Sequence, residues 1–83
     1  MLNNDYLAIK KYIKTLCIDN LKDLCKNTGL SEYETKLIHE IYNDNTRIAI
    51  SIKYHCCESK VYKDMRRAIS KINDYMKRNK IKY

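Results

Sequence analysis

The residues of this 83-residue sequence that are best suited to chemistry are cations near its C-terminal end. From Cys57 to Arg78, apolar residues recur at helical spacing for about five turns, and most cations of the segment fall on the opposite side of the same helix. The charged residues are Lys60, Lys63, Arg66, Arg67, Lys71, Lys77 and Arg78, against Glu58, Asp64 and Asp74. Lys and Arg bind phosphate and donate to guanine O6 and N7. The segment therefore has the side chains of a nucleic-acid-binding helix.

If Val61 and Met65 face the core, helical geometry selects the residues of the outer face. The candidate DNA-binding residues are Glu58, Ser59, Lys60, Tyr62, Lys63, Arg66 and Arg67, with Lys60 and Arg67 at the edges. Glu58 would accept from cytosine N4, Ser59 would bond to a base edge or a phosphate, and Tyr62 would contact phosphate or a thymine methyl group. A solvated charged face is the alternative. The net charge of +7 and a short helix before this segment favour DNA binding.

The segment 46–53 is that short helix, although its pattern alone is typical of a strand. Isoleucine alternates with other residues with period two. We nevertheless expect a helix capped by Thr46, because a lone strand has no partner to satisfy its backbone. As a helix, the segment is expected to bury its isoleucines against the helices on either side. These are Ile48, Ile50 and Ile52.

A tight turn at Tyr54 to Cys56 would connect this helix to the basic one. Ser51 offers the small side chain that two closely packed helices need, and Val61 with Met65 would face inward beyond the turn. The turn lacks the usual glycine, so we expect His55 at positive φ, which histidine tolerates better than β-branched residues do. Together the segments 46–53 and 58–78 predict a helix-turn-helix.

Three further helices are predicted upstream. Apolar spacing indicates one helix over 5–16, and a second that is capped by Asp19 or Asn20 and ends before Gly29, the only glycine. Ser31 followed by Glu34 is a capping-box pattern that starts a third helix over about 31–43. We therefore expect an all-α fold, a bundle of four to five helices with a C-terminal helix-turn-helix and a long last helix.

Length and composition indicate one domain, 1–83, because a chain this short supports one modest core. Its N-terminal helices would lie within 5–27, and the helix-turn-helix with its supporting helix within 31–78. The sequence has no run of 18 apolar residues and no apolar export signal in its first twenty residues. We expect a cytoplasmic protein without a membrane partner.

The stretch from Ile50 to Ile72, ISIKYHCCESKVYKDMRRAISKI, resembles a known helix-turn-helix. It is similar to the fourth conserved region of bacterial RNA polymerase sigma factors and to small phage and mobile-element regulators related to that region. The family's Ile-Ala pair, Ser-rich helix start, Val-Tyr pair and basic Ala-Ile-Lys-Lys-Ile tail correspond to Ile50-Ser51, Glu58–Lys60, Val61-Tyr62 and Ala68–Ile72. The upstream helix matches through Leu30, Ser31, Glu34, Ile38 and Tyr42.

Two departures from the family's pattern leave the register of the turn open. Ser51 replaces Ala, and two adjacent cysteines occupy the turn. A register that pairs Ile48 with Ala49, with a turn two residues longer, fits equally well.

We predict a sequence-specific DNA-binding transcription regulator whose helix from about 58 enters the major groove of double-stranded DNA. The resemblance implies a sigma-factor-like regulator of phage or mobile-element origin. The alternative is a protein-interaction module that binds RNA polymerase or another acidic partner without base readout. We do not expect an enzyme, because His39 and His55 are the only histidines and no phosphate loop, nucleophile elbow or paired-carboxylate set is present. No cofactor is expected.

The four cysteines favour neither disulfides nor zinc. Without an export signal, free thiols are the expectation, and no CxxC or HxxxH spacing occurs among the cysteines and histidines. A redox role for Cys57, at a helix N-terminus near His55, is an alternative that the sequence leaves open.

A homodimer and a monomer are both compatible with the apolar residues at the two ends of the chain. A single helix-turn-helix usually gains affinity from a second half-site. The same residues would otherwise cap the monomer core. They are Tyr6, Ile9, Tyr12 and Ile13 at one end and Tyr75, Met76, Ile81 and Tyr83 at the other.

Overall fold

The computed structural model describes residues 3–81, and every regular element in that range is an α-helix. The five helices are α1 (Asn3–Thr15), α2 (Ile18–Thr28), α3 (Glu32–Tyr42), α4 (Arg47–Lys53) and α5 (Glu58–Arg78). The predicted all-α class, with four to five helices and a long last one, is confirmed. None of the described helices is long and apolar enough to cross a membrane.

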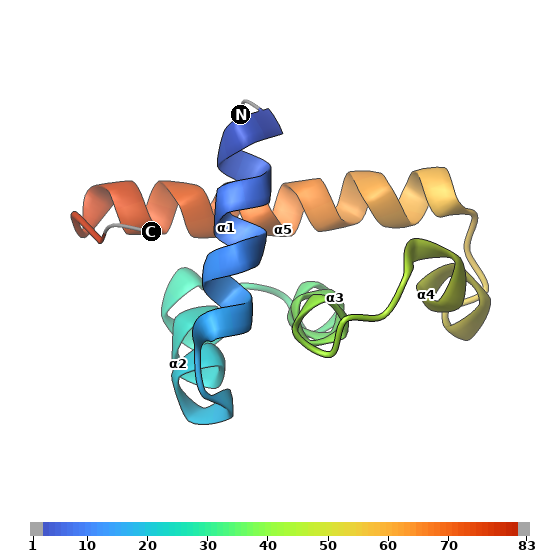
Figure 1. Ribbon diagram of the computed structural model, residues 1–83, viewed down its shortest axis with the longest axis horizontal. Helices are drawn as coiled ribbons and strands as arrows, with labels where there is room; N and C mark the ends of the chain where they lie inside the picture. Colours follow the sequence, from blue (N-terminus) through green and yellow to red (C-terminus); the bar gives the residue numbers. More distant parts are fainter. Residues whose placement is uncertain (1–2, 82–83) are drawn as a thin grey trace.

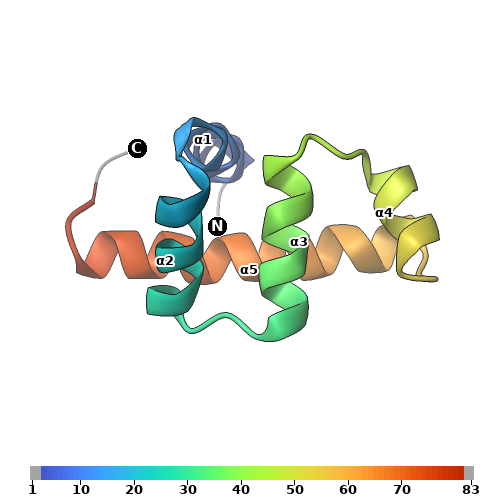
Figure 2. The same ribbon diagram turned by 90° about the horizontal axis from the view of Figure 1, so that it is seen from below.

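Helix α5 is the element on which the others assemble. Figure 1 shows it along the long axis of the molecule, with α1 crossing it and α4 near its N-terminal end. Each of the other four helices contacts α5, and α1 also contacts α3. Figure 2, turned by 90°, shows α1 and α4 on the same side of α5.

The core confirms the helical phase that the sequence predicted for α5. Val61 and Ile72 are completely buried, and Met65 is only 3% exposed. Apolar side chains from the other helices complete a single cluster around this stripe. The cluster's buried members outside α5 are Tyr6, Ile9, Ile13, Leu21, Leu24, Cys25, Leu37, Ile38, Ile41 and Ile50.

Local signals set several helix ends. The Ser31 hydroxyl accepts a hydrogen bond from the Glu34 amide at 3.2 Å, and the Glu34 carboxylate accepts from the Ser31 amide at 3.1 Å, which confirms the capping box. Gly29 ends α2 in the left-handed region with φ of 79°. The start of α2 differs from the prediction: Cys17, rather than Asp19 or Asn20, is the N-cap residue, so the helix begins earlier.

Residues 47–53 form a helix, as predicted, and the Thr46 hydroxyl caps it by accepting from the Ala49 amide at 3.1 Å. The expected burial of its isoleucines is wrong. Ile50 is fully buried, whereas Ile48 is 59% and Ile52 70% exposed. Residues two positions apart in a helix point in nearly opposite directions. A period-two set therefore cannot share one buried face: Ile48 and Ile52, four residues apart, lie on the exposed side of α4, opposite Ile50.

Most of the apolar residues considered for a dimer contact belong to the monomer core. Tyr6, Ile9, Ile13 and Met76 are buried in it. The partly buried residues Tyr12, Tyr75 and Ile81 pack against it. Tyr83 lies outside the described residues.

Replacing Ile72 by Ala is expected to lower the free energy of unfolding by about 2 to 5 kcal/mol, because a fully buried side chain loses both transfer energy and packing. Urea unfolding measures the change. Ile52→Ala is the matched control: its side chain is mostly exposed, so its loss should stay within about 0.5 kcal/mol. Equal losses in the two variants would contradict the helical phases given above.

Candidate nucleic-acid interface

Helices α4 and α5 are joined by a turn over residues 54–57. The Cys56 amide donates to the Ser51 carbonyl at 2.9 Å, which closes the turn onto α4. Ser51 is buried beside it, and its hydroxyl donates to the Ile48 carbonyl at 2.7 Å. His55 has φ of 56°, as its position in a turn without glycine predicted. The segment is thus a short helix, a tight turn and a long helix, the arrangement that a helix-turn-helix requires.

The backbone of His55 allows a direct test of this turn. Replacement by Val is expected to destabilise the protein by about 1 to 2 kcal/mol, since a β-branched residue is strained at positive φ. His55→Gly, which has no Cβ, should not suffer this loss. The side chain is exposed, so neither variant changes the core. Equal unfolding free energies for the Val and Gly variants would rule out the left-handed turn.

The seven candidate residues fall into two groups in the structure. Four of them line a surface hollow of about 370 Å³ together with Arg47, the first residue of α4. These four are Glu58, Ser59, Tyr62 and Lys63. Helices α4 and α5 both contribute to the hollow, so it brings four of the candidate residues together with a cation that was not among them.

Arg66 lies beside this hollow and contacts two tyrosine rings. Its Nη1 atom donates to the Tyr62 hydroxyl at 3.0 Å, and its guanidinium carbon lies 5.6 Å from the Tyr62 ring centroid and 5.3 Å from that of Tyr6. The two ring centroids are 6.1 Å apart. Guanidinium groups within about 6 Å of an aromatic ring are attracted to its face. The rings therefore restrict the orientations available to Arg66.

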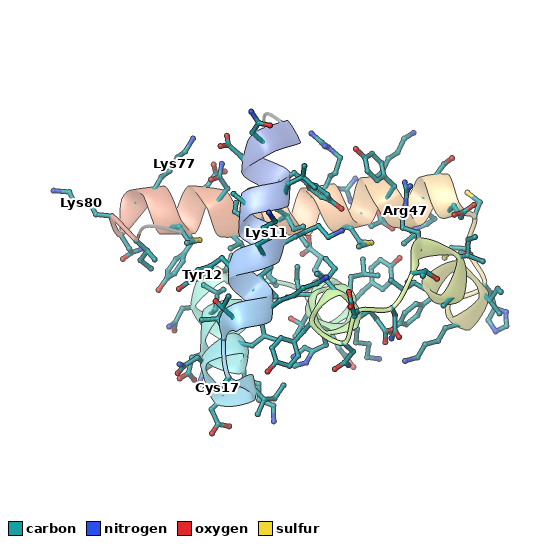
Figure 3. The ribbon with its side chains drawn as sticks, in the orientation of Figure 1. Lys11, Tyr12, Cys17, Arg47, Lys77 and Lys80 are labelled. Atoms are coloured by element: carbon teal, nitrogen blue, oxygen red, sulfur yellow. The ribbon has the colours of Figure 1, made fainter. Side chains whose placement is uncertain are left out.

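Two more cations join the same rings from other helices. Arg47 of α4 lies 5.1 Å from the Tyr62 centroid, and Lys10 of α1 lies 5.5 Å from the Tyr6 centroid. Figure 3 shows Arg47 near the N-terminal part of α5. We refer to Lys10, Tyr6, Arg66, Tyr62 and Arg47 as the cation–aromatic cluster.

The pKa of Tyr6 reflects this surrounding. Burial and the neighbouring Tyr62 raise the pKa, whereas Arg47 and Arg66 act in the opposite direction. Both guanidinium groups are therefore close enough to interact electrostatically with the Tyr6 hydroxyl.

Lys60 and Arg67 lie on the flank of α5 away from the cation–aromatic cluster, and both face the Asp64 carboxylate. Lys60 forms an ion pair with Asp64 at 2.8 Å, and Arg67 approaches the same carboxylate at 3.9 Å. The hydroxyl of Tyr33 in α3 donates a hydrogen bond to the Asp64 carboxylate at 3.0 Å. One turn further along α5, Lys71 pairs with Glu34 of α3 at 2.8 Å. Asp64 and Lys71 thus tie α5 to α3, whereas Lys60 and Arg67 pair within α5 and do not line the hollow.

Burial and hydrogen bonding act against each other on these carboxylates. The hydrogen bond from Lys60 is the main cause that lowers the pKa of Asp64, with burial opposing it and Tyr33 assisting. For Glu34, burial raises the pKa, but bonds from Lys71 and Ser31 outweigh it and leave the pKa below its usual value. Glu40 behaves in the same way: burial raises its pKa, but hydrogen bonds from Lys53 and Asn45 outweigh burial and leave the pKa below its usual value.

Acid should therefore destabilise the protein. A carboxyl whose pKa is lowered by folding contributes stability above its unfolded pKa, about 4, and loses it as the pH falls through the folded value. We expect the free energy of unfolding to decrease from about pH 5 downwards, more steeply in the wild type than in Asp64→Asn. Asp23→Asn, at an exposed position of α2, should keep the wild-type slope. If the free energy of unfolding fell equally with pH in the wild type and in Asp64→Asn, the role given to the Lys60–Asp64 pair would be refuted.

Residues from outside the basic helix were missed by the sequence analysis. Arg47 directly follows the cap residue Thr46, and its position at the start of the first helix of the motif was the available signal. Lys10 and Tyr6 carry no such signal, since only the fold brings α1 against α5.

The cysteines are all free thiols. Cys25 is buried, and burial raises its pKa to about 11. Cys57 is exposed at the start of α5, and its side chain makes no capping hydrogen bond. Among residues 3–81, no three of His, Cys, Asp or Glu gather in a group that could hold a metal ion.

Comparisons of the chain with family models, with curated proteins and with solved structures find no match.

Proposed function

We propose that the protein is a transcription regulator that binds double-stranded DNA in a sequence-specific manner, with the N-terminal half of α5 in the major groove. The observation that carries this proposal is the cation–aromatic cluster beside the hollow at the start of α5. There, Arg47 and Arg66 are held by tyrosine rings next to Lys63 and Ser59. Such a face can contact phosphates and base edges at once.

The parts of the face are proposed to have different tasks. Lys63 is exposed and Arg66 is half buried on the same side of α5, so each is a candidate donor to guanine, with Ser59 serving a base edge or phosphate. Arg47 lies at the start of the first helix, the element that crosses the phosphate backbone in this motif. The major groove of B-DNA is about 12 Å wide and admits one helix, which here would be α5.

Replacing Lys63 or Arg66 by Ala is expected to weaken binding to a selected duplex by about 1 to 3 kcal/mol each without unfolding the protein. Fluorescence anisotropy measures the affinity, and circular dichroism checks the fold. Lys77→Ala is the charge-matched control, because Figure 3 shows Lys77 toward the opposite end of α5 from Arg47. Unchanged affinity in both test variants would remove the proposed recognition face.

Base-independent binding to an acidic protein such as RNA polymerase is the second candidate. The exposure of Ile48 and Ile52 on α4 favours it, since exposed apolar side chains on a short helix suit a protein contact. Duplexes selected from a random pool decide between the two candidates. A reader of bases should prefer a selected duplex over a random one by about a thousandfold or more. A preference below about tenfold would favour the protein partner.

A further inference from the structure

The cation–aromatic cluster includes residues of α1, a helix that does not take part in the base recognition proposed above. Lys10 belongs to α1, yet its ammonium group lies 5.5 Å from the Tyr6 ring, which in turn lies 6.1 Å from the Tyr62 ring on α5. Arg47 lies on the same Tyr62 ring from α4. Three helices thus contribute cations to one pair of rings.

Two cations of this cluster, Lys10 and Arg47, have different surroundings from Lys14 and Lys53. Lys14 and Lys53 pair with carboxylates at 2.6 and 2.7 Å. Lys10 and Arg47 form no ion pair within residues 3–81 and are held by rings instead. A ring attracts a cation through its quadrupole but does not neutralise its charge. The charges of Lys10 and Arg47 therefore remain available to a phosphate group.

The position of α1 makes such a phosphate contact accessible. Figure 2 shows α1 and α4 on the same side of α5, so that Lys10 and Arg47 belong to elements that approach α5 from one side. Arg47 is exposed, and Lys10 is partly buried. A nucleic-acid strand that crosses α5 beside Arg47 would therefore meet α1.

We infer that α1 is part of the DNA-binding surface, and that Lys10 contacts a phosphate of the same strand as Arg47. The Tyr6–Tyr62 ring pair, with centroids 6.1 Å apart, lies between the elements that carry the two cations. This inference rests on the proposed function and extends it, because it adds a backbone contact from a helix outside the helix-turn-helix. Since phosphate contacts carry no sequence information, Lys10 contributes equally to selected and random duplexes.

The test compares the full chain with its Lys10→Gln and Lys11→Gln variants. Lys11 is the next residue on α1; it is exposed and makes no ring contact among the described residues. Affinities for a selected and a random 20-base-pair duplex are measured by fluorescence anisotropy from about 0.05 to 0.3 M salt. Thermal unfolding establishes that each variant is folded.

One lost phosphate contact lowers the slope of log affinity against log salt by about 0.9, which corresponds to about an eightfold loss at 0.1 M salt. We expect this loss for Lys10→Gln on both duplexes, and less than about a twofold loss for Lys11→Gln. Wild-type affinity in Lys10→Gln would overturn the inference. Equal losses in the two variants would also overturn it, because they would show only a general charge effect. A loss confined to the selected duplex would indicate a base contact and contradict a phosphate contact. Absence of any binding by the wild type would instead refute the proposed function itself.

Discussion

Burial of the apolar stripe on α5 is the constraint on which the rest of the structure depends. All four of the other helices contact α5, and its stripe from Val61 to Met76 is buried along the way. An apolar stripe of this kind fixes the rotation of a helix about its own axis. Once that rotation is fixed, the cations of α5 lie on its flanks and outer face, where their surroundings determine what they can bind.

The two flanks of α5 differ in what faces the cations. Toward α3, carboxylates take up the charge, as in the pairs Lys60–Asp64 and Lys71–Glu34. Toward α4, Arg47 forms no ion pair among the described residues and lies 5.1 Å from the centroid of the Tyr62 ring. A carboxylate neutralises a cation, whereas a ring orients it and leaves its charge available to a polyanion. This difference, more than the net charge, favours one flank as a surface for DNA.

Much of the fold could be predicted from the sequence because its signals are local. The capping box at Ser31, the stop at Gly29 and the helical spacing after Cys57 depend on neighbouring residues alone. Predictions that depend on how the helices pack against one another were less successful. The burial of Ile48 and Ile52 was predicted from type and spacing, although α4 can present only one side to the core.

The same limit applies to the candidate site. A helical projection places the seven candidate residues on a broad face, but it does not reveal that Asp64 and Tyr33 draw Lys60 to one edge. Nor does it reveal that α1 brings a ring and a lysine to the other edge. The helical pattern of α5 therefore predicts which side of the helix carries the candidate residues, whereas the contacts from α1 and α3 determine which of these residues lie together.

Backbone amide chemical shifts during titration with a selected DNA duplex test the central claim most directly, because they report on every helix at once. The account predicts that the largest changes occur at Arg47 and over residues 58–66, with small changes in α2 and in the α3 residues that face Lys60 and Lys71. Largest changes in α2 or α3, or no changes at a saturating DNA concentration, would contradict it.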